Sequence, residues 1–420
     1  MQGRRASPIL FFQRRWQWLR WGAPAAVVIG GLFGWWMVAW QADARSDAKG
    51  DAPVTAVSAR AVAASAPARV APYSAAGQQT REAQLALWQQ RKERAEQALQ
   101  TYTVHTRYPH TSRPAEEQAD QMFPNEPVVE EHPLREPKGQ AAAGVRLRTT
   151  QERVFVQGDE SVRFTVALVD EAGQAQPLRV LAASAREVTP ASVGSLYPPL
   201  PVTFNDDGTN GDRSAGDREL TATLRPAMQG FAKLAGQIRL ELSLEGRGER
   251  GFTYFDIYVT PEAPAAWSGR VRDAIDSSGA LNFYLGATVR EPGRYVVTGR
   301  IDDADGQPVA LLTFNDEVGR GDTEFTLSLF GKLVREAQPV MPLTLRDVVA
   351  FRLREEGHPD RALMPRLNGT VHVSAKHALA SFSNAEWSDE QRARYLAELT
   401  RDVEEAQKKV EQLSGPAQKP

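Results

Sequence analysis

The chain has 420 residues, a formal net charge of −2 at pH 7 and no cysteine. This near-neutral charge gives no electrostatic reason to expect nucleic acid as a partner. The absence of cysteine excludes disulfides, thiol catalysis and cysteine-ligated metal. The length allows two or three domains, and each must be stabilised by its own hydrophobic core.

Residues 22–40 form an uncharged apolar run, long enough to cross the ~30 Å hydrocarbon core of a bilayer once. The preceding segment, 1–21, contains five arginines and no acidic residue, which predicts a cytoplasmic N-terminus. We therefore expect a single-pass protein of a bacterial inner membrane, with most of the chain in the periplasm. The alternative is a cleaved signal peptide, because Ala42-Asp43-Ala44 has the form of a cleavage site. Both interpretations export the same domains.

Small residues recur at every fourth position of this apolar run, at Gly22, Ala26, Gly30 and Gly34. On a helix they would share one face, where small side chains allow a second helix to approach closely. The spacing is compatible with a homodimer through the membrane helix. The alternative is that glycine and alanine are simply common in membrane helices.

Residues 41–79 are rich in alanine and proline without a regular period, which indicates a flexible linker. Residues 80–143 are expected to form a helix, capped by Thr80, followed by an extended arm. Six prolines lie in this arm between residues 102 and 138, and each disfavours helix in the residue before it. We expect the arm to pack as a strap across the first globular domain, with a displayed peptide ligand as the alternative.

From Gly144 onward, short stretches of alternating apolar and polar residues, such as 162–169 and 238–244, predict strands and are separated by turn signals. This pattern predicts a mainly β chain with two tandem immunoglobulin-like antiparallel β-sandwiches, at 144–261 and 264–378. The N-terminal transmembrane helix and short α-helices would flank them.

Two sequence repeats support the tandem arrangement. The sequence Thr-Phe-Asn-Asp at 203–206 recurs at 313–316, 110 residues later, and Gly-Asp follows at the same distance in both copies. Upstream, residues 169–174 match residues 301–307 with one residue inserted. An offset of this size corresponds to about one immunoglobulin-type domain.

The chain closes with a predicted amphipathic helix at 385–413. Ser388 and Gln391 have the spacing of a capping box, and apolar residues then recur at steps of three and four. We expect this helix to pack on the second sandwich. Self-association or a partner helix is the alternative, because a narrow apolar stripe also suits a coiled coil.

The loop at 205–217 combines oxygen donors with glycines that permit tight curvature, as a calcium site requires. The alternative is a structured turn, because Asp and Asn also bond to their own backbone. In the second copy Val318 replaces Gly208 and Arg320 replaces Asn210, so that copy should bind an ion weakly or not at all. The candidate calcium ligands are Asp206, Asp207, Asn210, Asp212 and Asp217.

No catalytic motif stands out in the sequence. It has no paired histidines of a zinc protease, no nucleophile elbow and no phosphate-binding loop. His372 and His377 lie five apart on a predicted strand, which would place them on opposite faces. Residues 246–251 match a dinucleotide fingerprint by letter, but they lie between two predicted strands and are expected to form a hairpin tip. We therefore expect a chain that is not an enzyme and needs no cofactor, with calcium as the one candidate ion.

The loop at 205–217 resembles a loop of immunoglobulin-like modules in bacterial exported proteins, the choice-of-anchor X domains. In those modules the sequence Gly-Asp-Gly-x-Tyr leads from the loop into the next strand, whereas this chain has Gly-Asp-Arg-Glu-Leu at 216–220. The resemblance covers residues 145–380 and implies a β-sandwich outside the cytoplasm, without implying a reaction.

The expected function is that of a non-enzymatic, membrane-anchored periplasmic protein. It would bind or scaffold other envelope proteins in a secretion, pilus or surface-display system. One alternative is a catalytic or carbohydrate-active accessory protein with a site between the two sandwiches. Another is a cell-surface adhesin, although the N-terminal anchor and the small number of repeats disfavour it.

Overall fold

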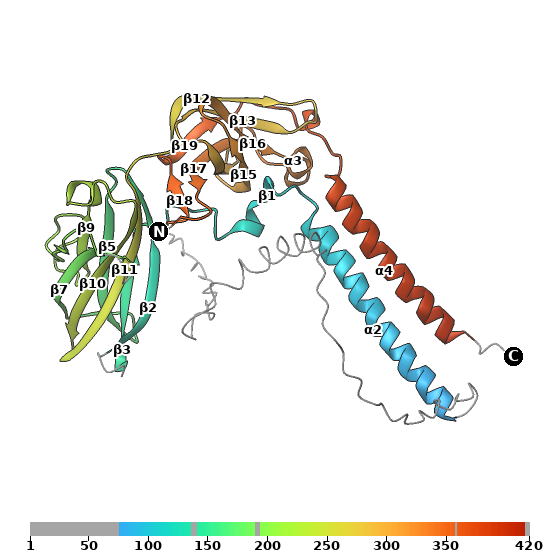
Figure 1. Ribbon diagram of the computed structural model, residues 1–420, viewed down its shortest axis with the longest axis horizontal. Helices are drawn as coiled ribbons and strands as arrows, with labels where there is room; N and C mark the ends of the chain where they lie inside the picture. The colour runs from blue at the N-terminus through green and yellow to red at the C-terminus, as the bar shows by residue number, and fades with distance from the viewer. Residues whose placement is uncertain (1–74, 136–140, 190–193, 358, 416–420) are drawn as a thin grey trace, which may run out of the picture. The chain divides into compact units, whose positions relative to one another are not determined.

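The computed structural model describes residues 75–135, 141–189, 194–357 and 359–415 (Figure 1). In these ranges the chain is mainly β, and nearly all of its strand pairs are antiparallel. This agrees with the fold class expected from alternating hydrophobicity, at the level of a β-rich chain with several antiparallel sheets.

The predicted membrane helix at 22–40, with its face of Gly22, Ala26, Gly30 and Gly34, lies outside the described residues. The same holds for the basic segment at 1–21 and for linker residues 41–74. Among the helices of the described part, none is both long enough and apolar enough to cross a membrane. The anchor and its topology therefore stay predictions.

Two sheets built from strands β2 to β11 form what we call the first β-module. One sheet has the order β2-β3-β5-β6, with β9 also paired to β5, and the other has the order β4-β11-β10-β7-β8. The strands are β2 (Val128–Arg135), β3 (Ala141–Gln151), β4 (Phe155–Gln157), β5 (Val162–Asp170), β6 (Ala175–Gln176), β7 (Leu178–Glu187), β8 (Leu200–Pro201), β9 (Leu220–Leu224), β10 (Gly236–Gly246) and β11 (Glu249–Thr260).

Both sheets of the first β-module contribute to one hydrophobic core. Alternation along β10 buries Ile238, Leu240, Leu242 and Leu244 on one face of its sheet. They join a cluster that includes Phe164 from the other sheet. The period of two in the sequence thus sets the face that each strand buries.

A second pair of sheets forms the second β-module. One has the order β1-β15-β14-β17-β18, with β19 also paired to β17, and the other has the order β12-β13-β16. The strands are β1 (Ser112–Pro114), β12 (Ala265–Ile275), β13 (Leu281–Val289), β14 (Gly293–Asp302), β15 (Pro308–Val318), β16 (Gly321–Leu329), β17 (Thr344–Leu353), β18 (Arg361–Leu363) and β19 (Leu367–Val373). Its two sheets also share one core, in which Phe283 and Phe325 from one sheet join Tyr295 from the other.

Helix α2 (Ala75–His105) and helix α4 (Glu390–Ser414) pack along one another (Figure 1). Arg392 Nε donates to the carbonyl of Thr106 at 2.9 Å, and the rings of Tyr102 and Tyr395 lie 5.7 Å apart. The expectation that the C-terminal helix packs mainly on the second sandwich is therefore wrong. Its apolar stripe instead faces α2, which presents a matching narrow stripe.

The start of α4 differs by one residue from the expected capping box. Asp389 is the N-cap, and its side chain accepts from the backbone N–H of Arg392 at 2.6 Å. Carboxylates cap helices at least as well as serine does, so Asp389 takes the place predicted for Ser388. The other helical segments are α3 (Gly331–Ala337), η1 (Ala115–Gln118), η2 (Pro226–Met228) and η3 (Leu379–Ser381).

The proline-containing segment after α2 packs on the second β-module, not across the first as expected. Strand β1 pairs with β15, and Met122 packs with Ala115 against Leu311 of β15. Arg300 of β14 donates to the carbonyl of Met122 at 3.2 Å. The physical reason is that β1 satisfies backbone groups that would otherwise be exposed along the edge of β15.

The last part of that segment is not a separate arm. Residues 128–135 form β2, which pairs with β3 inside the first β-module. The sheet therefore begins before residue 144, the boundary expected from the change in sequence texture. Pro133 is compatible with this place because β2 is an edge strand. The division of the chain into separate domains near 144–261, 264–378 and 385–413 stays a prediction.

Candidate functional site

The loop at 205–217 connects the end of β8 to β9, and its base is closed by backbone pairing. Asn205 N–H donates to Thr221 at 3.0 Å, and Thr221 N–H donates back to Asn205 at 2.8 Å. This bridge holds the first residue of the loop beside the strand that follows it. The loop is therefore a closed excursion from the sheet.

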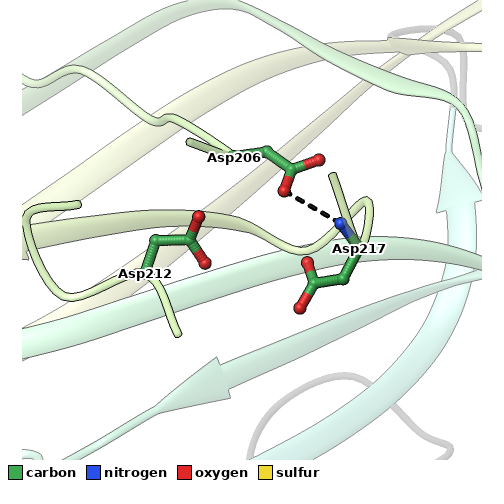
Figure 2. Close-up of side chains that lie close together, drawn as sticks. All are labelled: Asp206, Asp212 and Asp217. Atoms are coloured by element: carbon green, nitrogen blue, oxygen red, sulfur yellow. Dashed lines mark hydrogen bonds between the residues drawn. The ribbon is translucent and has the colours of Figure 1, made fainter. Parts of the chain in front are cut away.

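Asp206 ties the two ends of the loop together. Its Oδ1 accepts from the backbone N–H of Gly216 at 2.7 Å and from that of Asp217 at 3.1 Å, and the second of these bonds is drawn in Figure 2. Its Oδ2 accepts from the N–H of Arg218 at 2.9 Å. One carboxylate thus satisfies three backbone donors, and hydrogen bonds to a charged acceptor are stronger than neutral ones.

The carboxylates of Asp206, Asp212 and Asp217 lie close together (Figure 2). One oxygen from each lies within 4.8 Å of the others. Calcium binds oxygen ligands at about 2.3–2.6 Å, so this spacing fits three ligands of one ion. The three carboxylates belong to the set expected from the sequence.

Asp207 is not part of this cluster of carboxylates, and Asp207 and Asn210, the other two candidate ligands, both take part in hydrogen bonds of the loop. Asp207 Oδ1 accepts from the hydroxyl of Thr209 at 2.8 Å and from its N–H at 2.9 Å, and these bonds hold the pKa of Asp207 below its usual value. The Asn210 carbonyl accepts from the Thr223 hydroxyl at 2.8 Å. Both residues take part in the structured turn that was the alternative to an ion site.

The second copy of the motif has a different structure. Residues 313–318 lie within β15, and Gly321 begins β16 in the other sheet, so the copy forms a strand and a short connection between the two sheets instead of a long loop. Asn315 Oδ1 accepts from Arg294 Nε of the neighbouring strand at 2.7 Å. No acidic cluster suited to a metal is found among the described residues of this copy.

A cluster that the sequence did not suggest joins the two sheets of the second β-module. Asp273 on β12 accepts from His372 Nε2 at 2.8 Å through one oxygen and from His377 Nε2 at 3.0 Å through the other. The N–H of Ala375 approaches the same carboxylate at 3.3 Å. Because β12 and β19 belong to different sheets, one carboxylate links both layers.

Burial tends to raise the pKa of Asp273, but the hydrogen bonds from His372, His377 and the Ala375 N–H outweigh it and leave the pKa below its usual value. The expectation that the two histidines point to opposite faces is wrong. Strand β19 ends at Val373, so the alternation that governs His372 does not extend to His377. Asp273 lies about a hundred residues away in the chain, and no short motif could have revealed it.

No protein-family model matches this chain, and no curated protein matches it either. The resemblance to choice-of-anchor X domains is therefore not supported by a family match.

Several solved structures are similar to parts of the chain. A DUF4785 family protein from Legionella pneumophila has 13% identity and a TM-score of 0.37, covering 54% of this chain and 57% of that one. The α-2-macroglobulin of E. coli has 10% identity and a TM-score of 0.25, covering 58% of this chain and 18% of that one. Latent PorU from Porphyromonas gingivalis has 12% identity and a TM-score of 0.17, covering 63% of this chain and 21% of that one. The chain thus spans less than two thirds of each of these proteins, and at such TM-scores the likeness says nothing about function.

Proposed function

We propose that this chain is a non-enzymatic, membrane-anchored protein of a bacterial envelope. It holds two β-modules in the periplasm, where they bind or scaffold other envelope proteins. The observation that carries the proposal is the uncharged run at 22–40 preceded by five arginines and no acidic residue. A segment of this kind orients a protein with its C-terminal part exported.

The two β-modules are, in this proposal, immunoglobulin-like sandwiches. Support comes from the shared core between two antiparallel sheets in each module. Further support comes from a turn that both modules share. Asp170 Oδ1 accepts from the N–H groups of residues 172 and 174, and Asp303 Oδ1 accepts from those of residues 305 and 307. Sandwiches of this kind often bind proteins through loops and sheet edges.

Membrane fractionation of a chain with tags at both ends tests the anchor. We expect both tags in the inner-membrane fraction, with protease added to spheroplasts removing the C-terminal tag and sparing the N-terminal one. A variant with Val28→Arg and Leu32→Arg in the apolar run should lose membrane retention. Loss of the N-terminal tag from the mature wild-type protein would show a cleaved signal peptide instead.

Crosslinking in intact cells, followed by gentle solubilisation and purification, tests the scaffold role. A reproducible set of envelope proteins recovered with the wild type is the expected result. The matched control is the same chain released from the membrane by the two arginine substitutions. Recovery of the chain alone, or only with itself, would contradict the proposal.

We also propose that Asp206, Asp212 and Asp217 hold a calcium ion that stabilises their loop. The convergence of three carboxylates supports this, since a cation relieves the repulsion among them. Calcium should raise Tm in the wild type, and Asp212→Asn with Asp217→Asn should abolish the rise. Asp159→Asn is the matched control, because Asp159 lies in another turn. A Tm that calcium does not change would leave the structured turn as the full explanation.

A further inference from the structure

Strand β11 has one edge that the sheet leaves largely uncovered. It pairs along its whole length with β10, but β4 covers only residues 258–260 on the other side. There the N–H of Tyr258 donates to the carbonyl of Val154 at 2.9 Å. Because the register with β10 has no bulge, every second residue before Tyr258 directs its N–H and C=O toward the same edge.

Part of this edge is capped and part is open. Gln151 Nε2 donates to the carbonyl of Asp256 at 2.8 Å and so closes the edge there. Within the described residues, the edge-facing N–H and C=O of Phe252 and Tyr254 have no hydrogen-bond partner in the protein. Such a row of unpaired backbone groups is a template for another strand.

The open edge faces a groove of about 540 Å³ between β11 and β2, which lie side by side (Figure 1). Three large apolar side chains on its walls are strongly exposed: Val128 at 44%, Phe252 at 48% and Tyr254 at 49%. A groove with apolar side chains on both walls, beside unpaired backbone, suits an extended peptide with apolar residues at alternate positions.

The charge of the groove indicates one further property of the occupant. Glu130 and Asp256 both line it. Asp256 is neutralised by Arg239, which donates to both of its oxygens at 2.8 Å. Glu130 forms no ion pair within the described part of the chain. One uncompensated negative charge at the wall favours a basic side chain on the occupant.

We propose that this groove binds an extended peptide strand of a partner protein, which pairs with the open edge of β11. The strand places apolar side chains at alternate positions against Phe252, Tyr254 and Val128, and a lysine or arginine near Glu130. This inference deepens the proposed scaffold role and rests on it for the identity of the partner, while the binding itself can be measured on the purified chain.

The probe is a library of linear nine-residue peptides displayed on phage, panned against the purified full-length protein in detergent. We expect enrichment of alternating apolar sequences that contain a basic residue. Tyr254→Pro removes one edge-facing N–H without touching the ladder to β10, and it should weaken binding of a selected peptide about tenfold more than Tyr254→Ala does. The alanine variant is the matched control, because it keeps the N–H and loses only the ring.

Two further measurements keep the result clear if Tyr254→Pro lowers Tm. The first is N-methylation of the selected peptide, which leaves the protein unchanged. Methylating every second backbone nitrogen should abolish binding when these nitrogens face β11 and leave binding intact when the other set is methylated. Glu130→Gln should reduce the preference for the basic residue. No enrichment, or binding that neither Tyr254→Pro nor N-methylation affects, would overturn the proposal.

The outcomes also separate this inference from the proposed function. If crosslinking in cells recovers an envelope complex that Tyr254→Pro leaves intact, the scaffold role stands and the groove is not its contact. If peptides bind the groove but no complex forms in cells, the groove is a peptide site and the scaffold role fails. Pairing of two copies of the chain through β11, seen as a dimer that Tyr254→Pro dissociates, would overturn the assignment of a separate partner.

Discussion

The two β-modules carry the same pair of sequence motifs, but only one of the motifs has the same structure in both. In the turn after β5 the N–H of Asp170 donates to the carbonyl of Gln174 at 3.0 Å, and in the turn after β14 Asp303 donates to Gln307 at 2.9 Å. Each aspartate also accepts from two backbone N–H groups through Oδ1. The Thr-Phe-Asn-Asp motif, by contrast, opens a long loop in the first module and lies inside β15 in the second.

This difference shows how far a local sequence determines its own structure. The shared turn depends on one aspartate that accepts from backbone N–H groups two and four residues later, so a short local sequence is enough to form it in both modules. The loop instead depends on contacts ten to twelve residues away, such as those of Asp206 with residues 216–218. In the second module Asp322 follows Gly321 on a strand, and the chain has no residues left for a long excursion.

The glycines of the Gly-Asp pairs should give the largest contrast between the modules. Gly211 has φ +99° and a Cβ there would meet Thr223 Oγ1 at 2.5 Å, whereas Gly321 has φ +116° and open space. Gly211→Ala should therefore lower the free energy of unfolding of the first module by about 3 kcal/mol, from backbone strain and loss of the Thr223–Asn210 bond. Gly321→Ala should lower that of the second module by about 2 kcal/mol, from backbone strain alone. Hydrogen exchange of the flanking strand amides measures both locally. Equal costs would mean that Thr223 moves aside freely.

The aspartates of the Thr-Phe-Asn-Asp motif form the next matched pair. Asp206 accepts from three backbone N–H groups of its loop, and Asp316 Oδ1 accepts from the N–H of Glu317 at 2.8 Å. We expect Asp206→Ala to destabilise the first module by about 2 kcal/mol and Asp316→Ala to have an effect below about 0.5. Thermal unfolding with exchange data assigned to each module provides the measurement. A large effect at Asp316 would show that the second copy has a structural role that its hydrogen bonds do not reveal.

The stability of the second module should depend on pH in the acid range through Asp273. The folded pKa of this carboxyl lies below its unfolded value of ~3.9, so its contribution to stability is complete above that value and is lost as the pH falls through the folded pKa. Asp273→Asn should cost about 1.5 kcal/mol at pH 7, and the difference from wild type should shrink below pH ~4. Urea unfolding from pH 3 to 7 tests this, with Asp322→Asn as control. A difference that is independent of pH would contradict the role of the charged carboxylate.

The shared turn should give the smallest contrast, because both aspartates accept the same two backbone hydrogen bonds through Oδ1. Asp170→Ala and Asp303→Ala each remove two hydrogen bonds from backbone N–H groups to Oδ1. We expect each to cost about 1 kcal/mol in its own module, since both turns are exposed to water. Exchange of the turn amides should accelerate equally in the two variants. Unequal acceleration would mean that the repeat is similar in sequence but not in energetics.

Sequence periodicity alone was enough to identify many elements. Alternation predicted strands at 162–169 and 238–244, and the structure has β5 at Val162–Asp170 and β10 at Gly236–Gly246. The hairpin tip predicted at 246–251 is also confirmed, because Gly246 pairs with Glu249 across the turn. These features depend on neighbours within a few residues, which a single sequence displays directly.

The candidate ion site was predicted in part. Composition identified the loop, but five donors were equally plausible, and the structure brings together Asp206, Asp212 and Asp217. Which side chains converge depends on the path of the loop, and that path is set by the bridge between Asn205 and Thr221. Backbone closure over more than ten residues leaves no periodic signal in the sequence.

The sequence by itself determined the strands, the shared turn, the two helices and the composition of the acidic loop, because each follows from short-range spacing. The tertiary structure decided which surfaces these elements meet. It placed β1 on β15, brought Asp273 between His372 and His377, and left the edge of β11 open beside β2. Such contacts join residues far apart in the chain, and their free energy comes from burial and pairing that exist only once both partners are in place.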